Sequence, residues 1–153
     1  MNIAHRCRRG GVLALLLALG GGLRAQAPGV ATLTVTITGV RAEQGGELVV
    51  ALYDREPAWL LLDSARAVQR LVPSGDSAVA VFTGLPFDSS LAVAVIHDKN
   101  GNGRMDMRWF PFPKPKEGAG VSRNHQRMGK PRFAEAEFRL YNAEEAQRIV
   151  LRY

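Results

Sequence analysis

The stretch ATLTVTITGV, residues 31–40, indicates the structural class of this 153-residue chain. Leu33, Val35 and Ile37 alternate with threonines, so aliphatic side chains fall on one face of an extended segment and β-branched hydroxyl side chains on the other. This alternation is typical of a strand with one buried face. The stretch therefore predicts a β-strand that lines a hydrophobic core.

Further strand patterns follow along the chain, separated by residues that favour turns. They cover residues 47–54, 67–72, 78–85, 90–98, 131–141 and 147–153. Residues 91–96 are apolar on both faces, which places that strand centrally, whereas residues 55–67 fit either a helical turn or a loop over the sandwich edge. About seven short strands without a long helical pattern predict an all-β fold, an antiparallel immunoglobulin-like β-sandwich.

The first 27 residues have the pattern of a secretory signal peptide. Three arginines precede a short apolar run, and the tripeptide AQA at residues 25–27 supplies small residues at a cleavage site. The apolar run is short for a membrane span, although a retained N-terminal anchor is the alternative. We therefore expect an exported protein, periplasmic or extracellular and not integral to the membrane, with residues 1–27 as signal peptide and residues 28–153 as one domain.

Export changes how the cysteine and the charge are interpreted. Cys7 is the only cysteine and lies in the predicted signal peptide, so the mature domain has no disulfide and depends on a packed core. Four of the 20 Lys and Arg residues lie there as well, but none of the 14 Asp and Glu, which lowers the net charge from +6 to +2. The high isoelectric point of the full chain is therefore poor evidence for nucleic-acid binding, and we expect no nucleic-acid partner.

The segment DKNGNGRMD, residues 98–106, is the main candidate site, and we call it the Asp/Asn loop. Its ligand-type residues recur at every second position, as in loops that bind calcium through hard oxygens. The candidate metal ligands are Asp98, Asn100, Asn102, Arg104 through its backbone carbonyl, and Asp106. Gly103 stands where such loops turn sharply.

Two features limit this interpretation. The twelfth position of the loop holds Trp109 in place of a bidentate glutamate. Calcium would therefore bind weakly, with a dissociation constant of roughly 10⁻⁴–10⁻³ M. Glu117 is a further candidate ligand. Asn-Gly dipeptides also favour tight turns without any ion. The sequence leaves open a weak Ca²⁺ site and a metal-free turn.

The flanking residues carry two more open questions. His97 is either a strand-end histidine bonded to the backbone or a metal ligand that lacks a second imidazole nearby. From Arg104 to Arg132 the chain holds eight basic and two acidic residues, with aromatic residues among them. This basic segment is either a contact for an anionic surface or a solvated loop whose aromatic side chains cover one end of the sandwich.

No motif for catalysis or for an organic cofactor stands out. The chain has no G-x-S-x-G elbow and no phosphate-binding glycine loop after a strand, and Ser122 with His125 gives no specific triad signal. We therefore expect no catalytic and no cofactor-binding residues. The alternative is a cation-assisted hydrolase or carbohydrate-active enzyme that uses His97, Asp98 and Glu117.

Four segments together resemble the domain-of-unknown-function 2141 family of exported bacterial proteins. They are FTGLPFDSSLAVAVIHDKNGNGRMD (82–106), PKEGAGVSRN (115–124), PRFAEAEFRL (131–140) and IVLRY (149–153). Arg123 interrupts the usual Ser-Asn pair, and LPFDSSLAV lacks the glycine and tyrosine of the family's hairpin. The resemblance implies the architecture and export but no activity.

The Asp/Asn loop is also similar to calcium-binding loops in the transthyretin-like β-sandwich repeats of bacterial surface proteins. Together these features predict a non-enzymatic binding or structural module of the bacterial envelope, with an unknown envelope or extracellular ligand.

Overall fold

The structure is a computed structural model that describes residues 29–109, 111, 114–126 and 129–153. The predicted signal peptide, residues 1–27, lies outside these residues. Among the helices of the described residues, none has the length and apolar character needed to cross a bilayer.

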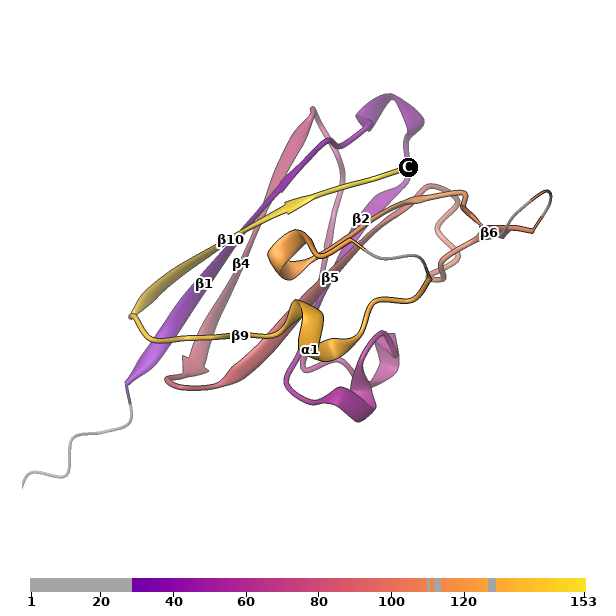
Figure 1. The fold of residues 1–153 in the computed structure, drawn as a ribbon. Coiled ribbons are helices and arrows are strands. Elements are labelled where there is room, and N and C mark those ends of the chain that lie inside the picture. Colours follow the sequence, from indigo (N-terminus) through magenta and orange to yellow (C-terminus); the bar gives the residue numbers. More distant parts are fainter. Residues whose placement is uncertain (1–28, 110, 112–113, 127–128) are drawn as a thin grey trace, which may run out of the picture.

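Strands dominate the described chain and form two main sheets (Figure 1). The first sheet has the order β10-β1-β4, from β10 (Glu144–Val150), β1 (Val30–Thr38) and β4 (Ser77–Pro86). The second has the order β3-β2-β5-β8, from β3 (Ala67–Leu71), β2 (Glu47–Tyr53), β5 (Ser90–Asp98) and β8 (Gly118–Val121), and β9 (Phe138–Arg139) also pairs with β5. A separate hairpin joins β6 (Met107–Arg108) to β7 (Lys114–Pro115). The fold is all-β, as predicted.

The helical elements are short and lie between strands. They are the 3₁₀ turns η1 (Ala42–Gln44), η2 (Glu56–Ala58), η3 (Leu62–Ser64) and η4 (Ser122–Asn124), and the single α-helical turn α1 (Phe133–Ala136).

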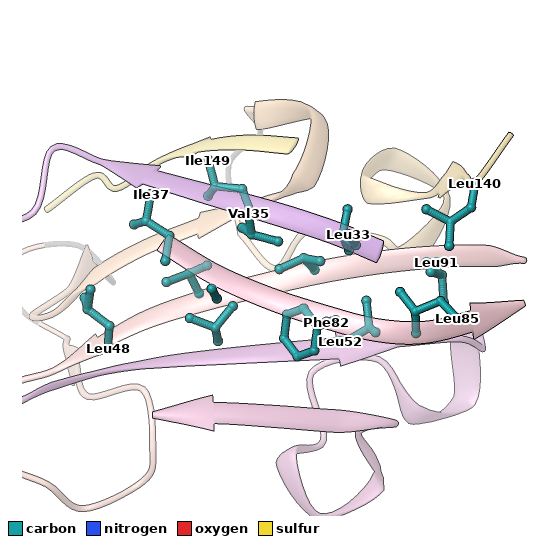
Figure 2. Packing of buried hydrophobic residues seen from close by; sticks show 14 of the residues in the cluster. Leu33, Val35, Ile37, Leu48, Leu52, Phe82, Leu85, Leu91, Leu140 and Ile149 are labelled. Carbon is teal, nitrogen blue, oxygen red and sulfur yellow. The ribbon is translucent and has the colours of Figure 1, made fainter. Parts of the chain in front are cut away.

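The main core lies between the two sheets, and β1 contributes to it as its alternation predicts. Leu33, Val35 and Ile37 are fully buried, whereas the threonines between them are half-buried on the outer face. Figure 2 shows these side chains above Leu48 and Leu52 of the second sheet. Burying an aliphatic side chain of this size stabilises the fold by about 1.5–3 kcal/mol, so this layer supplies a large share of the stability.

The central strand β5 is buried on both faces, as its sequence predicts. Its odd-numbered residues, such as Val93, face the core between the sheets. Ala92 and Ala94 face a second cluster on the outer side of the second sheet, built from Ala51, Tyr53, Ala58, Trp59, Val121, Phe133 and Ala136. The Trp59 indole N–H donates to the Pro131 carbonyl at 2.8 Å. The segments around η2, η3 and α1 therefore form a third layer over the second sheet.

One pair of strands departs from the predicted antiparallel arrangement. β10 runs parallel to β1, with Thr34 beside Ala146 and Ile37 beside Ile149. After β9 the chain turns at the end of the sandwich where β1 begins, and the Thr32 N–H donates to the Ala143 carbonyl at 2.8 Å. The final strand therefore runs beside β1 in the same direction.

The strand predicted over residues 131–141 is mostly wrong. A helical turn, α1, occupies Phe133–Ala136, and only the two residues of β9 are extended in a ladder. Phe133 and Ala136 are three residues apart, so a helical turn buries both on one face. A hydrogen bond of 2.8 Å from the Arg132 N–H to Glu135 Oε2 closes the start of the turn. The ambiguous segment 55–67 forms two 3₁₀ turns with Trp59 buried.

A glutamine side chain closes one edge of the sandwich. The Gln69 amide lies against the free edge of β4, where its Nε2 donates to the Val81 carbonyl and its Oε1 accepts the Val81 N–H at 3.4 Å. An unpaired strand edge invites pairing with another chain. Gln69 satisfies that edge locally.

The contact between β8 and β10 depends on a glycine. A Cβ at Gly120 would lie 2.6 Å from Ile149 Cγ2 and 2.8 Å from the Val150 carbonyl oxygen, whereas a Cβ at Gly75 meets no atom within 4 Å. We expect Gly120→Ala to lower the free energy of unfolding by about 1–3 kcal/mol through overpacking. Gly75→Ala, measured in the same urea titration, should change it by less than about 0.5 kcal/mol. Equal stability of the two variants would contradict this packing.

Candidate functional site

The end of β5 divides two neighbouring polar residues between opposite faces. His97 and Asp98 are both 0% exposed, but consecutive strand residues point in opposite directions. His97 lies on the side of the main core. Asp98 lies on the other side, where the register that pairs His97 with Gly118 brings Glu117 opposite it. The two carboxylates are therefore close, and the imidazole is on the other face.

The Asp98 carboxylate organises the Asp/Asn loop. Its Oδ1 accepts the backbone N–H groups of Gly101 at 2.8 Å and Asn102 at 3.2 Å, and its Oδ2 accepts that of Gly103 at 2.6 Å. Gly101 and Gly103 both have φ of 70°, a left-handed conformation that glycine adopts at little cost. Asp98 makes no ion pair within the described chain, so these N–H dipoles balance its buried charge.

The loop's other predicted ligands also come together. The Asn100 Nδ2 donates to Asp106 Oδ2 at 2.8 Å, and the Asn102 Nδ2 donates to Asp106 Oδ1 at 3.2 Å. The Asn100 Oδ1 accepts the Asn102 N–H at 3.2 Å, and the Asn102 Oδ1 accepts the Arg104 N–H at 2.8 Å. The hydrogen bonds of the loop are thus largely internal.

Glu117 closes the base of the loop. Its side chain is 2% exposed, and its two oxygens accept the backbone N–H groups of Lys99 and Asp106, each at 3.1 Å. The Lys116 N–H donates to the Asp106 carbonyl at 2.8 Å. The sequence suggests Glu117 only as an extra ligand. Its bonds to both ends of the loop depend on the β5–β8 pairing, which no local motif reveals.

The oxygen atoms of the loop fit a hard cation with incomplete protein ligation. In the described part of the chain, no three His, Cys, Asp or Glu side chains are grouped to hold a metal. A cation here would rely on Asp98 and Asp106 together with amide and backbone oxygens, a set that suits calcium. Each Asn side-chain oxygen accepts one N–H and keeps a second lone pair. The Arg104 carbonyl accepts no hydrogen bond from a described residue, so it too is available.

His97 has partners for both ring nitrogens. Its Nε2 donates to the Gly45 carbonyl at 2.7 Å, so its Nδ1 is the acceptor for the Tyr153 hydroxyl at 2.6 Å. The Tyr153 hydroxyl also accepts the Arg41 N–H at 3.1 Å. Burial raises the pKa of the Tyr153 phenol, which keeps this donor protonated. The geometry matches the prediction of a histidine bonded at a strand end.

Ser122 and His125 do not pair with each other. Ser122 is buried, and its hydroxyl donates to the Ala136 carbonyl and accepts the Val93 N–H at 3.0 Å. The His125 Nε2 lies 3.7 Å from Glu135 Oε1. The serine hydroxyl holds α1 against β5, so this pair has the contacts of a packing element.

The basic segment divides into two regions. Arg104 lies in the Asp/Asn loop, and Arg108, Trp109 and Lys116 follow it. The hairpin strand β6 lies near the end of the sheets in Figure 1. Later residues lie near α1, where the Arg123 guanidinium donates to the Glu137 carbonyl at 3.2 Å. Phe110, Phe112 and Arg127, which the sequence places in the same surface, lie outside the described residues.

The chain matches a model of a known protein family. A family model described as "Uncharacterized protein conserved in bacteria (DUF2141)" matches residues 35–148. No curated protein and no solved structure matches the chain. The matched span contains most of both main sheets and all of the Asp/Asn loop.

Glu117 accepts the backbone N–H groups of Lys99 and Asp106, and we call this pair of hydrogen bonds the clamp. An isosteric substitution tests it. In Glu117→Gln one of the two oxygens becomes an NH₂ group, which would face a backbone N–H instead of accepting from it. We expect the free energy of unfolding to fall by about 1–3 kcal/mol, and hydrogen exchange at the Lys99 or Asp106 amide to become faster. Glu56→Gln is the matched control, because it removes one negative charge at an exposed position. An unchanged exchange rate at both amides in Glu117→Gln would contradict the clamp.

Proposed function

The chain belongs to the domain-of-unknown-function 2141 family, and we propose that it is an exported, non-catalytic binding or structural module of the bacterial envelope whose Asp/Asn loop binds calcium weakly. The observation that carries the proposal is the packing of the Asn100, Asn102 and Asp106 side chains against one another beside a loop held by Asp98. Calcium ligation by side chains at alternate positions requires such a gathering.

The charges of the loop region support a cation. Asp98, Asp106 and Glu117 form no ion pair with any described residue, and two of the three are almost fully buried. Backbone and amide N–H groups offset these charges only as dipoles. A bound Ca²⁺ would balance two of the three charges and replace the two amide donors that contact Asp106.

The family and the layered strands support the finer architecture. Two sheets with a shared core support an immunoglobulin-like or transthyretin-like β-sandwich, to which the third layer over the second sheet is an addition. Export, to the periplasm or beyond it, is supported by the signal-peptide pattern in the sequence. We propose that the sandwich positions the loop and the β6–β7 hairpin for contact with an envelope partner.

The hydrolase alternative is less well supported by the geometry. It requires His97, Asp98 and Glu117 to converge on one cleft, but His97 lies on the opposite face of β5 from the two carboxylates. All three side chains are buried and hydrogen-bonded, mostly to the backbone. This arrangement supports a role for these three residues in holding the nearby backbone in place.

The calcium site predicts a stability shift that depends on Asp106. After removal of metal with EDTA, addition of about 10 mM CaCl₂ should raise the free energy of unfolding by about 1–3 kcal/mol, as expected for a dissociation constant near 10⁻⁴–10⁻³ M. Asp106→Asn should abolish most of the shift, because it removes one of the two ligating charges and leaves the acceptor role of Asp98 intact. Chemical denaturation with and without CaCl₂ measures both.

Asp63→Asn removes the charge of an exposed aspartate outside the loop and is the matched control. It should retain the full shift. No shift at this calcium concentration, or an equal shift in Asp106→Asn, would leave the metal-free turn as the correct description of the loop.

A further inference from the structure

A basic pocket lies at the base of the Asp/Asn loop. It has a volume of about 390 Å³ and is lined by Lys99, Arg108, Pro115, Lys116 and Tyr153. Of the five described residues that line it, three are cationic and none is acidic. Lys99 comes from the loop, Arg108 and Pro115 from the β6–β7 hairpin, and Tyr153 from the chain beyond β10, so only the tertiary structure assembles the pocket.

The cations of the pocket are not ion-paired in the part of the chain that the structure describes. Within the described residues, none of Lys99, Arg108 and Lys116 takes part in an ion pair. The Lys99 Nζ donates to the Lys116 carbonyl at 2.6 Å, which leaves two of its three N–H bonds without a partner among the described residues. Each of the three residues adds a positive charge to the lining of the pocket, and an anion bound there would be attracted to all three.

The nearby carboxylates are directed elsewhere. Both Glu117 oxygens accept backbone N–H groups at the loop base, and both Asp106 oxygens accept the amides of Asn100 and Asn102. Neither residue lines the pocket. The Arg41 guanidinium, which lies 4.3 Å from the centroid of the Tyr153 ring, adds a positive charge next to the pocket wall.

The backbone on either side of the pocket is held in place. The Lys99 N–H donates to Glu117, and the Lys116 N–H donates to the Asp106 carbonyl, so two of the cationic residues are attached to the same clamp. A backbone that is already held in place loses little further conformational entropy when a ligand binds. The clamp that shapes the loop therefore also positions the pocket.

We propose that this pocket binds a phosphate group through Lys99, Arg108 and Lys116. A phosphate group carries one negative charge as a diester and up to about two as a monoester or free ion, and it has several acceptor oxygens. These properties suit a pocket lined by three cationic residues, and the Arg108 guanidinium can contact two oxygens at once. The inference names a ligand class for the proposed binding function and does not require calcium in the loop.

Two sources can supply such a phosphate group. One is a soluble phosphate compound and the other is the headgroup of an anionic phospholipid. Trp109 follows Arg108 directly and is 73% exposed, a placement that suits the interface between a membrane and water. The two sources share the pocket chemistry and differ in whether a lipid surface is needed.

The experiment compares two triple variants that lose the same charge. Lys99→Gln, Arg108→Gln and Lys116→Gln are combined in one protein. Arg55→Gln, Arg139→Gln and Arg148→Gln, all at exposed positions that do not line the pocket, are combined in the other. Circular dichroism and urea denaturation establish that both are folded. Binding is measured in EDTA by calorimetry with inorganic phosphate and by co-sedimentation with phosphatidylcholine vesicles with and without phosphatidylglycerol.

The pocket variant should lose about tenfold or more in affinity, whereas the control variant should stay close to the unmodified protein. Binding to inorganic phosphate would indicate a soluble phosphate ligand, and binding only to phosphatidylglycerol vesicles would indicate a lipid headgroup. Absence of both, or an equal loss in the two triple variants, would overturn the proposal. Because EDTA is present throughout, either result leaves the calcium prediction to be decided by its own measurement.

Discussion

A strand that is buried on both faces must place consecutive side chains in two different environments, and β5 imposes this constraint on the whole molecule. Val93 and its odd-numbered neighbours enter the core between the sheets, and Ala92 and Ala94 enter the second cluster under α1. The same alternation continues to the end of the strand. There His97 points toward Tyr153 and Asp98 points toward the loop. The two residues therefore lie on opposite faces of β5 for the same reason that Val93 and Ala94 do.

Burial of charge explains why the loop has so many internal hydrogen bonds. A carboxylate removed from water is costly unless donors replace its hydration. Asp98 takes three backbone N–H groups from the loop itself, and Glu117 takes one from each end of it. The acids therefore determine the loop conformation seen in the structure. The proposed calcium site and the proposed phosphate pocket both depend on that conformation.

Local patterns were a good guide where one face of an element was plainly buried, and a poor guide elsewhere. The alternation around Leu33 and Val35 is reproduced by β1. In residues 131–141 apolar residues stand at both two- and three-residue spacing, and the packing of Phe133 and Ala136 against the second cluster favours a helical turn. The direction of β10 also escaped prediction, since it depends on where the chain turns after β9.

The sequence by itself determined the all-β class, the central position of β5 and the grouping of Asp98, Asn100, Asn102 and Asp106, because strand period and loop spacing are local properties. The tertiary structure alone decided which distant residues complete the site. Glu117 reaches the loop through the β5–β8 register, and Tyr153 reaches His97 across 56 positions of the chain. Such contacts arise from sheet pairing and core packing, and the free energy of those interactions is spread over the whole fold, so no short motif encodes them.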